Sequence, residues 1–98
     1  MNRAQREEAR WRILRALDAG RPIGVSETII LRLLQDIKLG LTAHGLRREL
    51  SYLEDRGLLQ VEGRQGPTWT AELTRLGVDV VEYTVPCEPG IARPEQWA

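Results

Sequence analysis

The sequence predicts one small α+β domain built from three helices, a two-stranded β-hairpin, a short closing helix and a C-terminal tail. Up to Gly57, apolar residues recur at steps of three and four, which is the period of a helix. After Gly57, apolar and polar residues alternate, which is the period of a strand. The length of 98 residues suffices for one such domain and is too short for two.

The first predicted helix runs from about Arg3 to Ala19, with arginines over much of its surface. Its apolar stripe consists of Trp11, Ile13, Leu14 and Leu17. Gly20 follows the last apolar position as a stop signal, and Pro22 prevents the helix from continuing. Trp11 is therefore expected in the core.

Ser26 and Thr42 are the predicted N-caps of a second and a third helix, because their hydroxyls can accept hydrogen bonds from first-turn N–H groups. Glu27 lies in the first turn of the second helix, where a negative charge faces the positive end of the helix dipole. The buried stripe of the second helix is expected to be Ile30, Leu33, Leu34 and Ile37. The third helix runs to about Arg56 and is expected to bury Leu46, Leu50 and Leu53.

The alternating segment after Gly57 predicts a β-hairpin with strands around Leu59–Glu62 and Trp69–Leu73. The glycine-flanked loop 63–67 is suited to reversing an antiparallel pair. Apolar Trp69 is expected on the buried side of its strand. Thr74–Tyr83 returns to a helix-compatible pattern and is predicted to be a short helix.

The predicted domain covers residues 1–83. Residues 84–98 carry three prolines, one glycine and scattered charges without a packing pattern, and they are predicted to form an extended or disordered tail. Ile91 and Trp97 are the apolar residues that could attach this tail to the body or to a partner.

The formal net charge is zero, but the charges are unevenly distributed along the chain. Residues 1–24 hold six arginines against three acidic residues, whereas residues 57–98 hold three arginines against six acidic residues. This asymmetry points weakly to a polyanionic partner. The alternative is that the arginine- and glutamate-rich first helix is simply well solvated.

Several classes of protein are excluded by composition. A lone Cys87 cannot form an internal disulfide and indicates a reduced thiol in a cytoplasmic protein. One His and one Cys lack metal-ligand spacing, and no nucleophile–base pair, carboxylate dyad or phosphate-binding loop suggests an enzyme or a cofactor. No apolar run is long enough to span a membrane, and the arginine-rich first residues argue against a secretory signal.

The run from Leu41 to Leu59 resembles the recognition-helix segment of bacterial winged-helix regulators of the MarR, ArsR and PadR type. In those families a small or polar cap precedes apolar residues at the positions of Leu46, Leu50 and Leu53, and "Leu-x-x-x-Gly-Leu" leads into the wing. The run 73–77, Leu-Thr-Arg-Leu-Gly, is similar to their "Leu-Thr-x-x-Gly" after the second wing strand. The resemblance covers roughly residues 8–83, and small winged-helix proteins of this kind also occur in Mu-like bacteriophages.

The resemblance implies a winged helix-turn-helix in which the third helix, 42–56, enters the major groove of DNA and the 63–67 wing lies on the backbone or the minor groove. The residues expected to contact double-stranded DNA are Thr42, Ala43, His44, Arg47, Arg48, Ser51 and Arg64. Arg47 suits guanine or a phosphate, and Arg48 suits a phosphate. Thr42 suits a phosphate at the helix start, and Arg64 is the only cation of the wing.

Each of these residues also has a structural interpretation. Arg47 and Arg48 can solvate the exposed face or pair with Glu49, Glu54 or Asp55, Thr42 can act only as a cap, and His44 can be an exposed first-turn residue. Because so few cations face DNA, specific binding by a small transcriptional regulator or phage DNA-transaction protein would require a homodimer formed through the first helix or the tail. The neutral charge also leaves open a protein–protein adaptor that keeps the fold without binding DNA.

Overall fold

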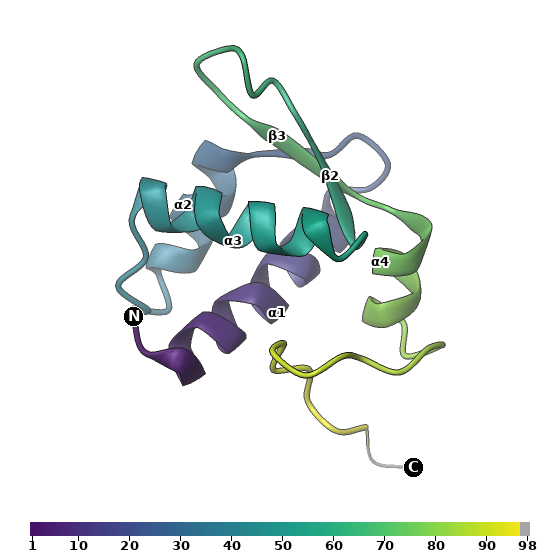
Figure 1. Cartoon of the computed structure of the whole chain (residues 1–98). Coiled ribbons are helices and arrows are strands. Elements are labelled where there is room, and N and C mark those ends of the chain that lie inside the picture. The colour runs from purple at the N-terminus through teal and green to yellow at the C-terminus, as the bar shows by residue number, and fades with distance from the viewer. Residues whose placement is uncertain (97–98) are drawn as a thin grey trace.

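The computed structural model describes residues 1–96. It contains α1 (Arg3–Ala19), β1 (Val25–Ser26), α2 (Glu27–Gln35), α3 (Ala43–Asp55), β2 (Leu59–Glu62), β3 (Thr70–Leu73) and α4 (Arg75–Val81). The helices pack together along one side of a small antiparallel sheet, and the β2–β3 hairpin projects beyond them (Figure 1). The predicted α+β class and the order of its helices and hairpin are confirmed.

The predicted helix boundaries depend on side-chain caps, and these caps are present. The Ser26 hydroxyl accepts the Ile29 N–H, and the Thr42 hydroxyl accepts the Gly45 N–H at 3.0 Å. At the other end of α3, Gly57 takes a φ of +75°, a left-handed conformation that favours glycine and ends the helix.

The sheet has one strand more than the sequence predicted. Its order is β1-β3-β2, and the two residues of β1 pair with Ala71 and Thr70 of β3. A two-residue strand leaves no alternation to detect, and Ser26 serves at once as a strand residue and as the cap of α2. β1 thereby fixes the start of α2 against the hairpin.

The core is built mainly from α1 and α3. The side chains that are shielded almost completely from solvent are Ile13, Leu14, Leu17, Ile30, Leu46, Leu50, Leu53 and Leu59. Trp11 is also buried, so the predicted stripes of these two helices are confirmed. Since α1 contacts α2, α3, β3 and α4, it is the element around which the others pack.

The predicted buried stripe of the second helix is wrong in two of its four positions. Ile30 and Leu34 are buried, but Leu33 is 50% exposed and Ile37 is 37% exposed. Helix α2 ends at Gln35, so Ile37 lies in the following turn. A nine-residue helix buries only the face that touches α1 and α3, and Leu33 lies at the exposed edge of that face.

Residues 84–96 form no helix or strand, but they pack against the body (Figure 1). Ile91 is buried, as the sequence suggested for an attachment point, whereas Trp97 lies outside the described residues. The Arg93 guanidinium donates to the carbonyls of Val80 and Val85, both at 2.9 Å. The part of the tail that the structure describes is therefore extended and ordered against α1 and α4.

A largely buried arginine joins this segment to two helices. Arg10 of α1 donates from Nε to Glu49 of α3 at 2.7 Å and from Nη1 to the Gly90 carbonyl at 2.8 Å. Its guanidinium also lies 3.6 Å from the centroid of the Tyr52 ring. Glu49 is only 5% exposed, so its charge depends on Arg10 for compensation.

Replacing Arg10 with Ala should lower the free energy of unfolding by about 3–5 kcal/mol, because it leaves the Glu49 carboxylate buried without its ionic partner. Urea denaturation at pH 7 measures this change. Arg12→Ala, which removes the exposed pair with Glu8 on the same helix, should cost below about 1 kcal/mol. Equal costs for the two variants would contradict the assigned role of Arg10.

Candidate nucleic-acid interface

The residues predicted to contact DNA lie together on one surface, which we call the α3–hairpin face. His44, Arg47, Arg48 and Ser51 line a shared hollow with Trp69 of the hairpin. Ala43 lines a second hollow with Pro67 and Thr68, and Thr42 lines a third at the start of α3. From the hairpin loop, the Arg64 guanidinium reaches to 3.4 Å from the Ser51 hydroxyl.

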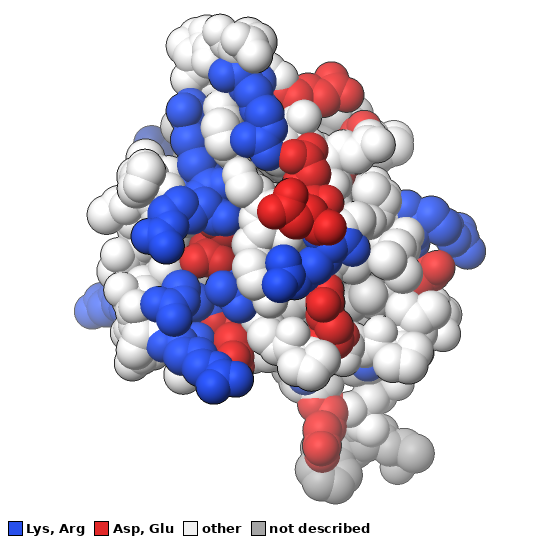
Figure 2. Space-filling model, in the orientation of Figure 1, with Lys and Arg blue, Asp and Glu red and all other residues white. Residues whose placement is uncertain are grey.

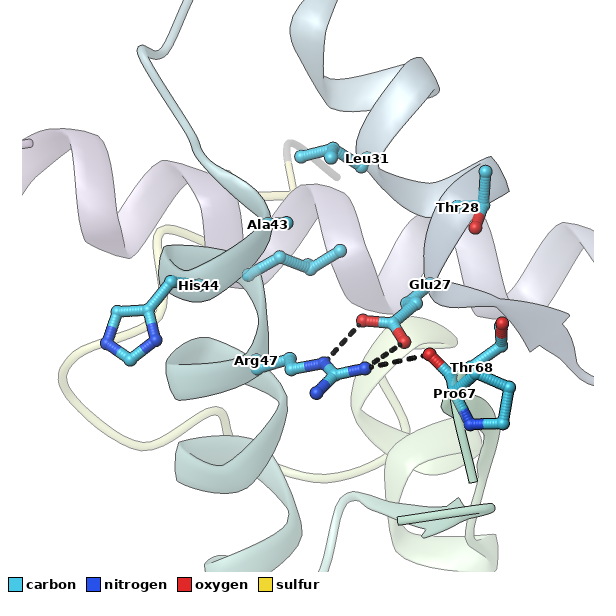
Figure 3. Close-up of a pocket in the computed structure, with 9 residues that line it drawn as sticks. Glu27, Thr28, Leu31, Ala43, His44, Arg47, Pro67 and Thr68 are labelled. Carbon is cyan, nitrogen blue, oxygen red and sulfur yellow. Dashed lines mark hydrogen bonds and ion pairs between the residues drawn. The ribbon is translucent and has the colours of Figure 1, made fainter. Parts of the chain in front are cut away.

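Arg47 does not project freely from this face. Its Nε and Nη2 each donate to the Glu27 carboxylate at 2.7 Å, and Nη2 also donates to the Pro67 carbonyl at 3.2 Å (Figure 3). The guanidinium lies 4.5 Å from the centroid of the Trp69 ring. Of the structural alternatives to a DNA contact, pairing of Arg47 with acidic residues of its own helix is not observed, because its carboxylate partner lies on α2.

Glu27 is the acceptor at the centre of this arrangement. It is 8% exposed, and its carboxylate also accepts the Trp69 N–H at 2.6 Å. The hydrogen bond from Arg47, assisted by that of Trp69 and opposed by burial, holds the pKa of Glu27 below its ordinary value of 4.5. One carboxylate thus connects the start of α2, the middle of α3 and the loop end of the hairpin.

Sequence reasoning gave Glu27 only a role at the helix dipole and missed this connection. The available signal was its spacing, because Glu27 precedes Ile30 by three residues and Leu34 by seven. All three therefore lie on the buried side of one helix. A carboxylate on a buried face requires a cationic partner, although the sequence does not reveal which arginine supplies it.

Arg64 is also paired, but in a more exposed setting. Its Nη2 donates to Oε1 of Glu54, and its guanidinium lies 4.3 Å from the centroid of the Trp69 ring. The other oxygen of Glu54 accepts the Val61 N–H at 2.8 Å. That backbone hydrogen bond is the main reason that the pKa of Glu54 is lowered. Arg64 therefore holds the hairpin loop against the C-terminal half of α3.

Trp69 lies where these two arginines meet. It is half-buried and packs against the edge of the core, so it is only partly the core residue that the sequence predicted. Its Nε1 is buried and has no hydrogen-bond partner within the described residues. Two guanidiniums on one indole ring are an arrangement that cation–π attraction favours.

Arg48 differs from Arg47 and Arg64. It is exposed, and no side-chain hydrogen bond or ion pair of residues 1–96 involves it. Together with Arg6 of α1 it lines the hollow at the start of α3. Figure 2 shows the basic side chains gathered down the left of this view and most of the acidic ones to their right. The N-terminal half of α3 is thus on the basic side of the face.

Other kinds of site find little support in the part of the chain that the structure describes. No group of three or more His, Cys, Asp and Glu side chains there could hold a metal ion. Burial raises the pKa of the Cys87 thiol, which favours its protonated form. None of the helices in residues 1–96 has the length and apolar character needed to cross a membrane.

Comparison of the chain with family models, curated proteins and solved structures gave no match. The candidate interface therefore depends on the geometry and charges of this chain alone.

The Glu27 carboxylate should make stability depend on pH in the acid range. Because its pKa is lowered by folding, the stabilisation is present above about pH 4.5 and is lost as the pH falls through the folded-state value. Glu27→Gln should cost about 1.5–3 kcal/mol at pH 7, and the difference from the wild type should shrink on acidification.

Chemical denaturation at a series of pH values from neutral to acid measures this dependence. Glu62→Gln is a matched control, because Glu62 lies exposed on β2. A cost for Glu27→Gln that stays constant across the series would contradict the assigned ionic role.

Proposed function

We propose that this domain is a winged helix-turn-helix protein that binds double-stranded DNA without catalysing a reaction. Helix α3 would enter the major groove, and the 63–67 loop of the hairpin would act as a wing on the backbone. The order helix, helix, helix, hairpin, helix and the resemblance of the 41–59 segment to bacterial regulators support this proposal.

The observation that carries the proposal is the single α3–hairpin face. The exposed side of α3 and the hairpin loop lie next to each other, so one duplex could contact both. A 13-residue helix is about 20 Å long and fits a major groove about 12 Å wide. Exposed His44 and Arg48 and the capping Thr42 occupy the first two turns, where such helices meet base edges and phosphates.

The ion pairs suggest different roles for the three arginines. The Arg64–Glu54 pair is partly exposed and is worth about 1 kcal/mol or less, so Arg64 can exchange Glu54 for a phosphate at small cost. Arg47 is held by a nearly buried carboxylate, and breaking that pair would strand the charge of Glu27. We therefore assign Arg47 to positioning the wing, and Arg48 and Arg64 to contacting phosphate.

Fluorescence anisotropy with a labelled random duplex tests this assignment. Binding should weaken as salt rises from about 50 mM to about 200 mM, with a shallow slope because few phosphates are neutralised. Arg48→Ala should weaken binding and reduce the slope of log K against log salt by about 0.9, the share of one phosphate contact. Arg64→Ala should act in the same direction.

Arg75→Ala is the matched control, because Arg75 is exposed on α4, away from the α3–hairpin face. It should bind like the wild type. Absence of binding at about 50 mM salt, or equal affinities for Arg48→Ala and Arg75→Ala, would refute the proposal.

The second candidate is a protein–protein adaptor with the same fold. The specific observation in its favour is that Arg47 and Arg64 already have carboxylate partners, which leaves the face with little net charge. Such an adaptor would show no salt-dependent affinity for DNA, so the same titration separates the two candidates.

A further inference from the structure

The outer side of α2 carries an apolar row that nothing in the described chain covers. Ile29 is 55% exposed, and Leu33 and Ile37 follow at intervals of four residues with the exposures given above. Four-residue steps place these side chains one above another on a helix and its continuing turn. The neighbouring stripe of α2, which carries Ile30 and Leu34, faces the core. The apolar surface of α2 is therefore wider than the part of it that the core covers.

Two opposite charges flank this row. Arg32 and Asp36 are exposed and lie about one turn apart. Arg32 follows Ile29 by three residues, and Asp36 follows Leu33 by three. Their four-residue spacing would permit a pair within the helix. Within the described part of the chain, however, none of the ion pairs involves either residue. The row thus has a cation towards its N-terminal end and an anion towards its C-terminal end.

We propose that α2 docks antiparallel onto α2 of a second copy of this chain, around a two-fold axis at Leu34. With a rise of about 1.5 Å per residue, Arg32 lies about 3 Å before the axis and Asp36 about 3 Å after it. The two-fold rotation reverses these positions in the other copy. Arg32 of each copy consequently faces Asp36 of the other, and two equivalent ion pairs form.

The same axis also matches the apolar rows. Leu33 lies about 1.5 Å and Ile29 about 7.5 Å before the axis, and Ile37 lies about 4.5 Å after it. After rotation, Ile37 of one copy falls midway between Leu33 and Ile29 of the other, as in the interdigitation of packed helices. The same two-fold axis thus pairs the opposite charges of the two copies and interdigitates their apolar rows. This match favours a second copy of the chain over an unrelated protein as the partner.

This inference goes beyond the proposed function and is independent of it, because the dimer would form without DNA. A single nine-residue helix offers a small contact, at the low end of specific interfaces (below about 1,200 Å² in total). The dimer should therefore depend on protein concentration. It would carry two α3–hairpin faces and so provide the second half-site contact that one neutral domain lacks.

Sedimentation equilibrium of the full chain without DNA, from about 1 µM to about 1 mM, tests the proposal. The wild type should pass from monomer to dimer, whereas Leu33→Asp should remain monomeric because it places charges at the centre of the contact. Ile23→Asp is the control, since Ile23 is 87% exposed in the loop before β1 and should leave dimerisation unchanged.

A charge exchange tests the axis itself and leaves the apolar row intact. Arg32→Asp and Asp36→Arg should each weaken dimerisation about tenfold, because both ion pairs become like-charge contacts. The double variant Arg32→Asp/Asp36→Arg should recover wild-type dimerisation. Circular dichroism confirms that each variant is folded.

A wild type that stays monomeric throughout, or a dimer that survives Leu33→Asp, overturns the proposal. A double charge variant that dimerises no better than the single variants also overturns it. Since no DNA is present, these outcomes are separate from failure of the proposed DNA binding.

Discussion

The Glu27 carboxylate accepts hydrogen bonds from Arg47 and from the Trp69 main chain in a position that is almost free of solvent. Its place at the start of α2 is fixed by the Ser26 cap and by the pairing of β1 with β3. A charge in such a position is tolerated only when its partners are held in place. Glu27 therefore helps to hold the start of α2, α3 and the loop end of the hairpin in their relative positions, together with the core contacts between α3 and β2.

This constraint gives the α3–hairpin face a rigid part and an adaptable part. Arg47 and the Trp69 main chain belong to the rigid part, since moving either would expose or strand Glu27. Arg64 belongs to the adaptable part, because its pair with Glu54 is partly exposed and the second oxygen of Glu54 keeps its bond to Val61. Under the proposed function, the fixed residues would direct the loop, and Arg64 would be able to adjust to the DNA backbone.

The sequence predicted features that depend on local chemistry. The caps at Ser26 and Thr42, the glycine after α3 and the stripes of α1 and α3 follow from rules that act within a few residues. The candidate site residues also assemble on one surface, because helix periodicity placed most of them on the same side of α3.

The errors concern contacts between distant parts of the chain. Whether Leu33 is buried depends on how many sides of α2 its neighbours cover, and periodicity does not report this number. Arg47 pairs with Glu27, twenty residues away, and not with the acidic residues of its own helix, because the fold places the buried Glu27 carboxylate beside it. The packing of the tail similarly includes a contact between distant residues, because Arg10 donates to the Gly90 carbonyl, eighty residues further along the chain.

Net charge is a poor guide to what this domain presents to a partner. Glu27, Glu49 and Glu54 are engaged by Arg47, Arg10 and Arg64 respectively, and these pairs add nothing to the net charge. The field at the start of α3 is then determined by the cations outside such pairs, Arg48 and Arg6. A chain of zero formal charge can thus present a basic patch to a phosphate backbone. Because this basic patch is small, one copy would bind DNA weakly under the proposed function. Joining two copies through α2 would raise the affinity for DNA without adding basic residues to the chain.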